Sequence, residues 1–188
     1  MAIAALRQTV EVPVGPLTYE DLRELPDESG LRFELLDGVL LMTPSPVRRH
    51  QIAALNLATL LKAAAPPNTA VMIAPYDWFV TDGRVFQPDV FVVPDSGRDE
   101  TRYEGVPLLA VEVLSPSTRA RDLGIKRLAY AEAGLAYYWV VDPDTPSLTA
   151  FHLVNGRLTE YARSAGDERF ETVAPFRAVV VPTELIAP

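Results

Sequence analysis

The sequence contains no cysteine and only 2 histidines among its 188 residues. The lack of cysteine excludes disulfides, thiolate zinc sites, iron–sulfur clusters and cysteine nucleophiles. So few histidines cannot build a histidine-rich metal site. The sequence also has no glycine-rich phosphate loop and no serine in a nucleophile elbow. These absences exclude sulfur- and histidine-based metal chemistry and the common serine hydrolase pattern.

Long apolar runs are absent as well. No run approaches the roughly 20 residues that a membrane-spanning helix needs. The first residues contain Arg7 and Glu11 around a short apolar stretch, which is not the pattern of a signal peptide. We therefore expect a cytoplasmic protein with no membrane partner, a location that the lack of cysteine also fits.

Basic residues are fewer than acidic ones, with 17 Lys and Arg against 25 Asp and Glu and a net charge of −8. DNA-binding proteins usually gain affinity from cations that neutralise phosphates, so this balance argues against a general nucleic-acid coat. It does not exclude a local basic patch beside a functional site, because the fields that matter for binding are local.

The length and the hydrophobic content of 48% suit one globular domain with a sizeable core. We expect an N-terminal extension at residues 1–16 and a single domain at residues 17–188. The order of helical and extended segments in the middle of the chain predicts an α/β (α+β) fold, with a mixed β-sheet flanked by helices.

Hydrophobic periodicity and turn signals predict the individual elements. Helices are expected at residues 18–25, 47–64 and 119–133. The Asp37-Gly38 pair predicts an N-terminal hairpin, since glycine adopts the positive φ of a tight turn. Strands are expected at residues 32–36, 39–42, 71–74, 78–80, 90–93, 108–114 and 137–141, with a polar loop at 96–105. Residues 147–181 alternate short β runs with turns, which predicts a C-terminal antiparallel meander.

Glu112 is the most informative single residue, because it interrupts the apolar run at residues 108–114. A run that is apolar on both faces is typical of a central strand. A carboxylate buried there costs several kcal/mol unless a partner satisfies it, so paired or metal-bound carboxylates are expected at such positions. The alternative is a glutamate at the strand end that bridges to an arginine.

Asp89 follows Pro88 at the entrance to the apolar run at residues 90–93. Proline fixes φ and donates no ladder hydrogen bond, which suits a strand entrance where a side chain points into a cleft. Together with Glu112 on a neighbouring strand, Asp89 would form an oxygen-rich site of the kind that Mg²⁺ (or Mn²⁺) prefers, and the carbonyl of Val113 could add a ligand. The alternative is a turn aspartate bonded to its own backbone.

Lys126 lies early in the helix that follows the Glu112 strand. Asp122, Lys126 and Tyr130 are spaced by four residues and therefore share one helix face. A lysine there could reach back over the strand end and orient an attacking water or stabilise a pentavalent phosphate. The alternative is a solvated lysine paired with Asp122.

The set of motifs resembles the Uma family of restriction endonucleases, within the PD-(D/E)XK nuclease superfamily. The likeness covers about residues 17–186, and the ordered set is more specific than any one motif. The matching pieces are Phe-Glu-Leu-Leu-Asp-Gly at 33–38, Ser-Pro-Val-Arg-Arg-His at 45–50, Gln-Pro-Asp-Val at 87–90, Val-Glu-Val-Leu-Ser-Pro-Ser-Thr at 111–118, the Asp122, Lys126, Tyr130 spacing, and Tyr-Tyr-Trp-Val-Val-Asp-Pro at 137–143.

The resemblance implies a restriction-endonuclease-like fold, a divalent metal and hydrolysis of phosphodiester bonds. It assigns Pro88-Asp89 to the family's "PD" and Glu112 to its second acidic ligand. The superfamily's lysine two residues after that acid is replaced by Leu114 here, so the resemblance moves the catalytic lysine to Lys126.

Glu34 is a further catalytic candidate, because the superfamily often has an extra acid from its N-terminal part; the alternative is an exposed hairpin glutamate. His50 could contact a phosphate or shuttle a proton, or it could pack on a loop. Several arginines near the ends of the two longer helices predict a basic rim that contacts DNA: Arg48, Arg49, Arg119, Arg121 and Arg127. The alternative is that they are solvated residues of the helix surface.

We therefore predict a Mg-dependent endodeoxyribonuclease that acts on DNA, and a homodimer or higher homo-oligomer, since cutting two strands needs two sites. The acidic composition keeps a second hypothesis open, a catalytically inactive module with this fold that binds nucleic acid or protein. A third is a metallo-hydrolase acting on a small phosphate ester.

Overall fold

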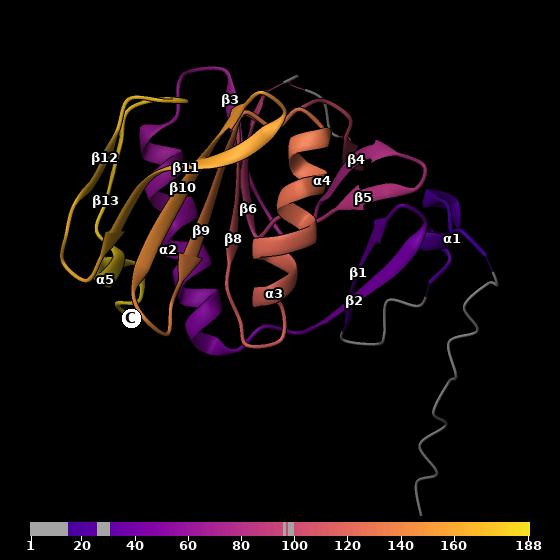
Figure 1. Cartoon of the computed structure of the whole chain (residues 1–188), viewed down its shortest axis with the longest axis horizontal. Coiled ribbons are helices and arrows are strands. Elements are labelled where there is room, and N and C mark those ends of the chain that lie inside the picture. The colour runs from indigo at the N-terminus through magenta and orange to yellow at the C-terminus, as the bar shows by residue number, and fades with distance from the viewer. Residues whose placement is uncertain (1–14, 26–30, 96, 98–99) are drawn as a thin grey trace, which may run out of the picture.

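The computed structural model describes residues 15–25, 31–95, 97 and 100–188. The expected N-terminal extension, residues 1–16, therefore lies almost wholly outside the described residues. Two larger β-sheets and several helices make up the described part (Figure 1). The helical segments are α1 (Tyr19–Arg23), α2 (Arg48–Ala64), α3 (Arg119–Arg121), the π-helical segment η2 (Asp122–Lys126), α4 (Arg127–Glu132) and α5 (Pro182–Leu185).

A 6-stranded mixed sheet forms the centre of the molecule. Its neighbouring strands are antiparallel except for β8 and β9, which run parallel and are linked through the α3–η2–α4 helix. In spatial order the strands are β11 (Arg157–Ala165), β10 (Ser147–Val154), β9 (Tyr137–Asp142), β8 (Leu109–Val113), β6 (Val90–Pro94) and β3 (Thr69–Ile73).

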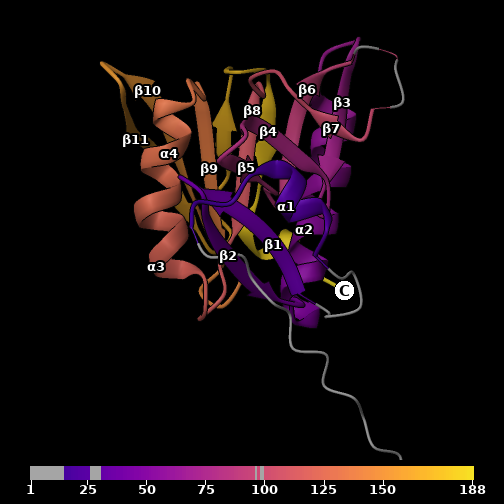
Figure 2. The ribbon, with the colours of Figure 1, turned by 90° about the vertical axis from the view of Figure 1, so that its right-hand side faces the viewer.

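A 5-stranded sheet lies beside the central sheet and comes in front of it in Figure 2. It contains the predicted N-terminal hairpin, whose turn residues Asp37 and Gly38 have φ of 52° and 76°. In spatial order its strands are β2 (Val39–Pro44), β1 (Leu31–Leu36), β5 (Arg84–Phe86), β4 (Asp77–Thr81) and β7 (Arg102–Tyr103). A separate 2-stranded ladder pairs β12 (Phe170–Thr172) with β13 (Ala178–Val180).

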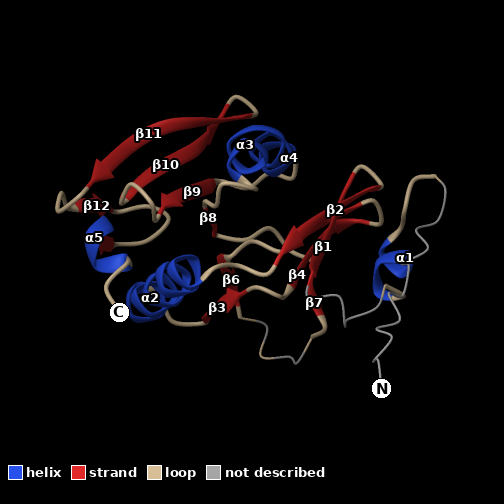
Figure 3. Cartoon of the chain, turned by 90° about the horizontal axis from the view of Figure 1, so that it is seen from below, coloured by secondary structure: helices blue, strands red, loops and turns tan. Residues whose placement is uncertain are grey.

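Helices cover both faces of the central sheet, with α2 on one side and α3–α4 on the other (Figure 3). Leu57 and Leu61 of α2 are fully buried against one face of the sheet. Tyr130 of α4 packs on the opposite face, together with aromatic side chains from the 5-stranded sheet. The second core therefore joins the two sheets, and it is the one that borders the candidate site.

The expected mixed sheet flanked by helices is confirmed, with three differences. The loop expected at 96–105 contains the short strand β7, and neither β5 nor α5 was predicted. Only β10 and β11 of the expected C-terminal meander belong to the central sheet. Among the described residues, no helix combines the length and the apolar character needed to cross a bilayer.

Candidate active site

Glu112 lies on β8 and faces the α3–η2–α4 helix. Side chains alternate between the two faces of a strand. Val111 and Val113 belong to the core on the α2 side, whereas Ala110 and Leu114 belong to the core on the α4 side, so Glu112 shares their face. The residue is only 3% exposed. The sequence-based prediction of a buried acid on a central strand therefore holds for its position.

The cation that pairs with Glu112 is Lys126, at the end of the π-helical segment. Lys126 Nζ lies 2.6 Å from Glu112 Oε1. Tyr130, four residues further along the helix, donates its hydroxyl to the same oxygen at 2.6 Å. Because Lys126 is 2% exposed, the alternative of a solvated helix lysine is wrong. The alternative for Glu112 was an ion pair with an arginine; the structure instead pairs Glu112 with Lys126.

The π-helical turn runs from Asp122 to Lys126 and separates α3 from α4. Both of these residues are buried, and each belongs to the polar cluster around Glu112. Tyr138 of β9 donates its hydroxyl to the carbonyl oxygen of Asp122 at 3.0 Å. Single π turns inside α-helices are frequent at functional sites. Here the turn carries Asp122 and Lys126, two of the three charged side chains that the helix contributes to the cluster; the third is Arg121 of α3.

Glu34 reaches Lys126 from the other sheet, across 92 residues of sequence. Lys126 Nζ donates to Glu34 Oε1 at 2.9 Å and to Oε2 at 3.2 Å. The backbone N–H of Gln87 also donates to Glu34 Oε1, at 2.8 Å. Since Glu34 is buried, the alternative of an exposed hairpin glutamate is wrong. One lysine thus ties the 5-stranded sheet to the central sheet.

Asp89 stands at the entrance of β6, beside β8. Val90 pairs with Val111 in antiparallel register, so Asp89 and Glu112 are the next facing positions on these two strands. The backbone N–H of Val113 donates to Asp89 Oδ2 at 2.9 Å. The observed partner of Val113 at this site is thus Asp89, through the backbone N–H of Val113. The Val113 carbonyl stays a predicted metal ligand.

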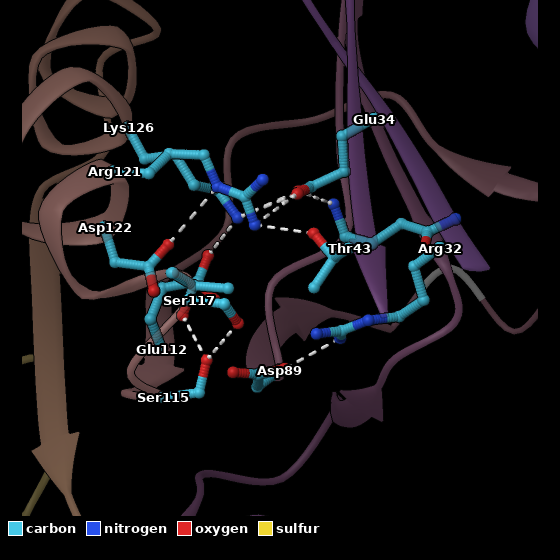
Figure 4. Close-up of polar contacts among 12 residues, drawn as sticks. Arg32, Glu34, Thr43, Asp89, Glu112, Ser115, Ser117, Arg121, Asp122 and Lys126 are labelled. Carbon is cyan, nitrogen blue, oxygen red and sulfur yellow. Dashed lines mark hydrogen bonds and ion pairs between the residues drawn. The ribbon is translucent and has the colours of Figure 1, made fainter. Parts of the chain in front are cut away.

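Two side chains complete the surroundings of Asp89. Arg32 Nη1 donates to Asp89 Oδ1 at 2.7 Å, and His50 Nε2 lies 3.0 Å from Oδ2. Asp89 is 4% exposed. Its bonds go to distant segments, so the alternative of a turn aspartate bonded to its own backbone is wrong. Figure 4 shows Asp89, Glu112, Lys126 and Glu34 in one polar cluster between the helix and the β1–β2 hairpin.

The acids of the polar cluster are Glu34, Asp89, Glu112 and Asp122, and its basic groups are Arg32, His50, Arg121 and Lys126. Around Glu112 itself carboxyl groups prevail, because the largest charge interactions of Glu112 are with three acids and one ammonium group. Burial, opposed by the charge of Lys126 and assisted by the charges of Asp89, Asp122 and Glu34, raises the pKa of Glu112 to about 8. The pKa of Glu112 in the metal-free site is therefore well above that of an ordinary glutamate.

Lys126 has the opposite response to the same surroundings. Burial by itself lowers the pKa of a lysine, but the carboxylates of Glu112, Glu34 and Asp122 outweigh it and raise the pKa of Lys126 well above the usual range. Lys126 is consequently an ammonium group at neutral pH. It can donate hydrogen bonds and stabilise negative charge, but it cannot accept a proton from water.

Asp89 remains ionised. Burial acts to raise its pKa, but the hydrogen bond and charge of His50, the charge of Arg32 and the N–H of Val113 lower the pKa of Asp89 well below its usual range. The two acids predicted as a pair therefore have pKa values shifted in opposite directions, although Asp89 lies at the entrance of the strand next to β8.

Carboxylate oxygens such as those of Asp89 and Glu112 are the donor atoms that hard divalent cations prefer. Mg²⁺ is commonly held by one or two carboxylates, with water and substrate phosphate completing the coordination. Among the described residues, no three His, Cys, Asp or Glu side chains are grouped so as to hold an ion, and Asp89 and Glu112 stay predicted ligands. The excess of carboxyl groups favours a cation here, because added positive charge lets Glu112 ionise.

The predicted basic residues are dispersed. Arg121 is in the cluster, where it donates to Thr43 Oγ1 at 2.6 Å. Arg48 and His50 line a cavity next to Asp89. The other three lie elsewhere: Arg49 is 3.8 Å from Asp144, Arg119 is ion-paired with Asp142, and Arg127 lies over the ring of Phe151. The five arginines therefore do not form one continuous rim.

Sequence reasoning missed Arg32 and the role of the Tyr130 hydroxyl. Arg32 stands two residues before Glu34 on β1, so the alternation that turned Glu34 inward also applies to Arg32. The spacing placed Tyr130 on the correct helix face, but only the packed structure shows its hydroxyl on Glu112.

A mixed central sheet covered by helices on both faces, with this arrangement of strands, defines a restriction-endonuclease-like protein. The chain belongs to the Uma2 family, which is described as "Putative restriction endonuclease" and whose model matches residues 19–183. No curated protein matches the chain.

Among solved structures, the chain is similar to one described as a "putative nuclease belonging to DUF820" from Anabaena variabilis. The TM-score is 0.70 at 16% sequence identity, and the match covers 91% of this chain and 98% of that chain. At this identity the likeness supports the fold alone. The family and the fold together support a nuclease.

Proposed function

We propose that the protein is a metal-dependent nuclease that hydrolyses phosphodiester bonds in DNA. Asp89 and Glu112 would hold Mg²⁺ or Mn²⁺, and Lys126 and Glu34 would complete the catalytic group. The observation that carries the proposal is the position of Lys126 Nζ, which lies 2.6 Å from Glu112 and 2.9 Å from Glu34 at the junction of the two sheets.

Lys126 would act by its charge. Its ammonium group is fixed by two carboxylates, so it needs no reorganisation when negative charge develops on a nearby phosphate. Glu34 would hold Lys126 in place from the opposite side, and Tyr130 would fix the rotamer of Glu112 through its hydroxyl. Arg32 and His50 would orient Asp89 in the same way.

A divalent cation bound by the two acids would supply positive charge beside the phosphate and polarise a nearby water. The remaining work falls to the protein. The buried site excludes bulk water, which strengthens every charge interaction within it. A bound cation would lower the pKa of Glu112, which burial and neighbouring negative charge raise to about 8.

The experiment is cleavage of plasmid DNA and of single-stranded DNA with added Mg²⁺ or Mn²⁺. We expect the wild type to cut, and Asp89→Asn and Glu112→Gln to lose activity by about 100-fold or more, the scale on which rates fall when one preorganised polar group is removed. Glu171→Gln is the control, because Glu171 is exposed on the separate β12 ladder and paired with Arg169.

Binding of Mn²⁺ is measured by calorimetry on the same proteins, which gives a second readout apart from activity. We expect the binding heat to disappear in Asp89→Asn and to remain in Glu171→Gln. Equal cleavage by the wild type and both site variants would disprove the assigned roles. Thermal unfolding curves of all variants establish that a lost activity does not reflect a lost fold.

One observation favours a second candidate, a non-catalytic module that binds nucleic acid or protein. Both oxygens of Asp89 already accept hydrogen bonds, from Arg32, His50 and the backbone of Val113. A cation must compete with these donors. DNA binding in the presence of a chelator, with neither cleavage nor Mn²⁺ heat under any condition, would select this candidate.

A further inference from the structure

A cavity of about 510 Å³ opens beside Asp89, and Arg32 and His50, which both contact this carboxylate, also line it. This volume falls within the range of roughly 300–1,000 Å³ that is typical of small-molecule sites. Its walls come from β1, the first turns of α2, and the end of β3 with the turn that follows. Because Asp89, Arg32 and His50 border both the cavity and the polar cluster, an occupant would be continuous with a phosphate in the proposed active site.

One part of the cavity wall suits an anion. Helix α2 starts at Arg48, has no acidic residue in its first turn, and follows Val47, whose side chain cannot cap the first N–H groups. Such a helix start attracts negative charge. His50 in this turn is only 5% exposed, and its Nδ1 has no hydrogen-bond partner among the described residues. Arg48 adds a guanidinium group to the same wall, whereas the guanidinium of Arg32, which also lines it, is paired with Asp89.

The rest of the wall is apolar and reaches the surface. Arg48, Ile52 and Leu55 follow one another along one face of α2 at helical spacing, so the wall changes from charged to apolar within two turns. Leu55 is 61% exposed and Ile73 of β3 is 51% exposed. A nucleotide joins an anionic phosphate to a flat base that can pack on apolar side chains. This chemistry matches a cavity wall that is charged near Arg48 and apolar near Ile52 and Leu55.

We infer that the cavity binds one unstacked nucleotide of the substrate strand, next to the phosphate that is cut. Its own phosphate lies at the start of α2 near Arg48, and its base packs on Ile52, Leu55 and Ile73. The inference rests on the proposed nuclease function and specifies its substrate class, single-stranded DNA. Bases in an intact duplex are stacked inside the helix and cannot enter a cavity without being extruded.

The test measures binding of a single-stranded oligodeoxynucleotide that contains one 2-aminopurine, by anisotropy and by 2-aminopurine fluorescence, in EDTA. We expect fluorescence to rise on binding to the wild type, because the base leaves its stack. Leu55→Glu is expected to weaken this binding about tenfold, the scale of one lost base contact. Glutamate is a good helix former, so this exposed position tolerates the change.

Leu128→Glu is the matched control, since Leu128 is 59% exposed on α4 and lies outside the cavity lining. Equal binding by Leu55→Glu and Leu128→Glu, or no rise in fluorescence with the wild type, would overturn the inference. Cleavage is assayed separately with Mg²⁺. If Leu55→Glu does not affect cutting, the nuclease proposal stands and the nucleotide-binding cavity is disproved. If Leu55→Glu selectively loses binding and no protein cuts, the cavity stands and the nuclease proposal is disproved.

Discussion

Asp89, at the entrance of β6, and Glu112, on the neighbouring strand β8, are both buried but have opposite electrostatic surroundings. Asp89 accepts hydrogen bonds from a guanidinium, an imidazole and a backbone N–H, and its pKa is lowered. Glu112 has one ammonium and one tyrosine hydroxyl, shares that ammonium with Glu34, and its pKa is raised. Burial alone therefore does not decide the charge of an acid.

The difference separates a part of the site whose charge is fixed by several donors, around Asp89, from a part whose charge depends on a single shared lysine, around Glu112. The Asp89 side is satisfied by fixed donors and does not depend on Lys126. The Glu112 side depends on one lysine that serves two acids from two sheets. Titratable pairs whose surroundings push their pKa values apart are typical of catalytic centres. The consequences can be tested by removing the partners on each side in turn.

The largest effect is expected from Lys126→Met. It leaves Glu34 and Glu112 buried without their cation, a change that typically costs about 3–5 kcal/mol of unfolding free energy. Arg32→Met, on the other side, should cost less, since His50 and the Val113 N–H still satisfy Asp89. Urea unfolding of both variants measures this difference.

Lys62→Met is the control for the loss of a lysine, because Lys62 is exposed near the end of α2. Its effect should stay within about 0.5 kcal/mol, as is usual for surface substitutions. If Arg32→Met were as destabilising as Lys126→Met, the contrast between the two sides of the site would be wrong.

Much of the fold could be predicted because its signals are local. The helix at 48–64, the Asp37-Gly38 hairpin and the apolar strands at 90–94 and 109–113 carry their own periodicity or turn chemistry. Strands β5 and β7 could not be recognised, since they have only 3 and 2 residues and exist through pairing with β4. The division into two sheets likewise depends on long-range contacts.

The acids and the lysine of the site were identifiable as residue types in unfavourable places. Their partners were not, because the bonds span long sequence separations: 57 residues from Arg32 to Asp89 and 39 from His50 to Asp89. The excess of carboxyl groups around Glu112 is also a property of packing. It arises only when β1, β6, β8 and the α3–η2–α4 helix come together.

A smaller and more selective effect is expected from pH in the metal-free protein. The pKa of Glu112 is about 8 when folded and roughly 4.3 when unfolded. Between these values the folded state binds more protons than the unfolded state, so stability falls as pH rises. Asp89 adds no slope here, because its lowered pKa keeps it ionised throughout. Urea unfolding in EDTA should show a decline from about pH 5 to about pH 8 in the wild type that is much reduced in Glu112→Gln; parallel curves for the two proteins would contradict the raised pKa.

The smallest effect is expected from removing single hydroxyl groups. Tyr130→Phe deletes the hydrogen bond to Glu112 while Lys126 remains, which should lower the free energy of unfolding by about 1 kcal/mol. Tyr161→Phe is the matched comparison, because the buried Tyr161 hydroxyl has no hydrogen-bond partner among the described residues. Deleting an unsatisfied hydroxyl should be neutral or slightly stabilising. Equal losses in the two variants, measured by urea unfolding, would mean that the Tyr130 hydroxyl contributes packing alone and that Glu112 depends only on Lys126.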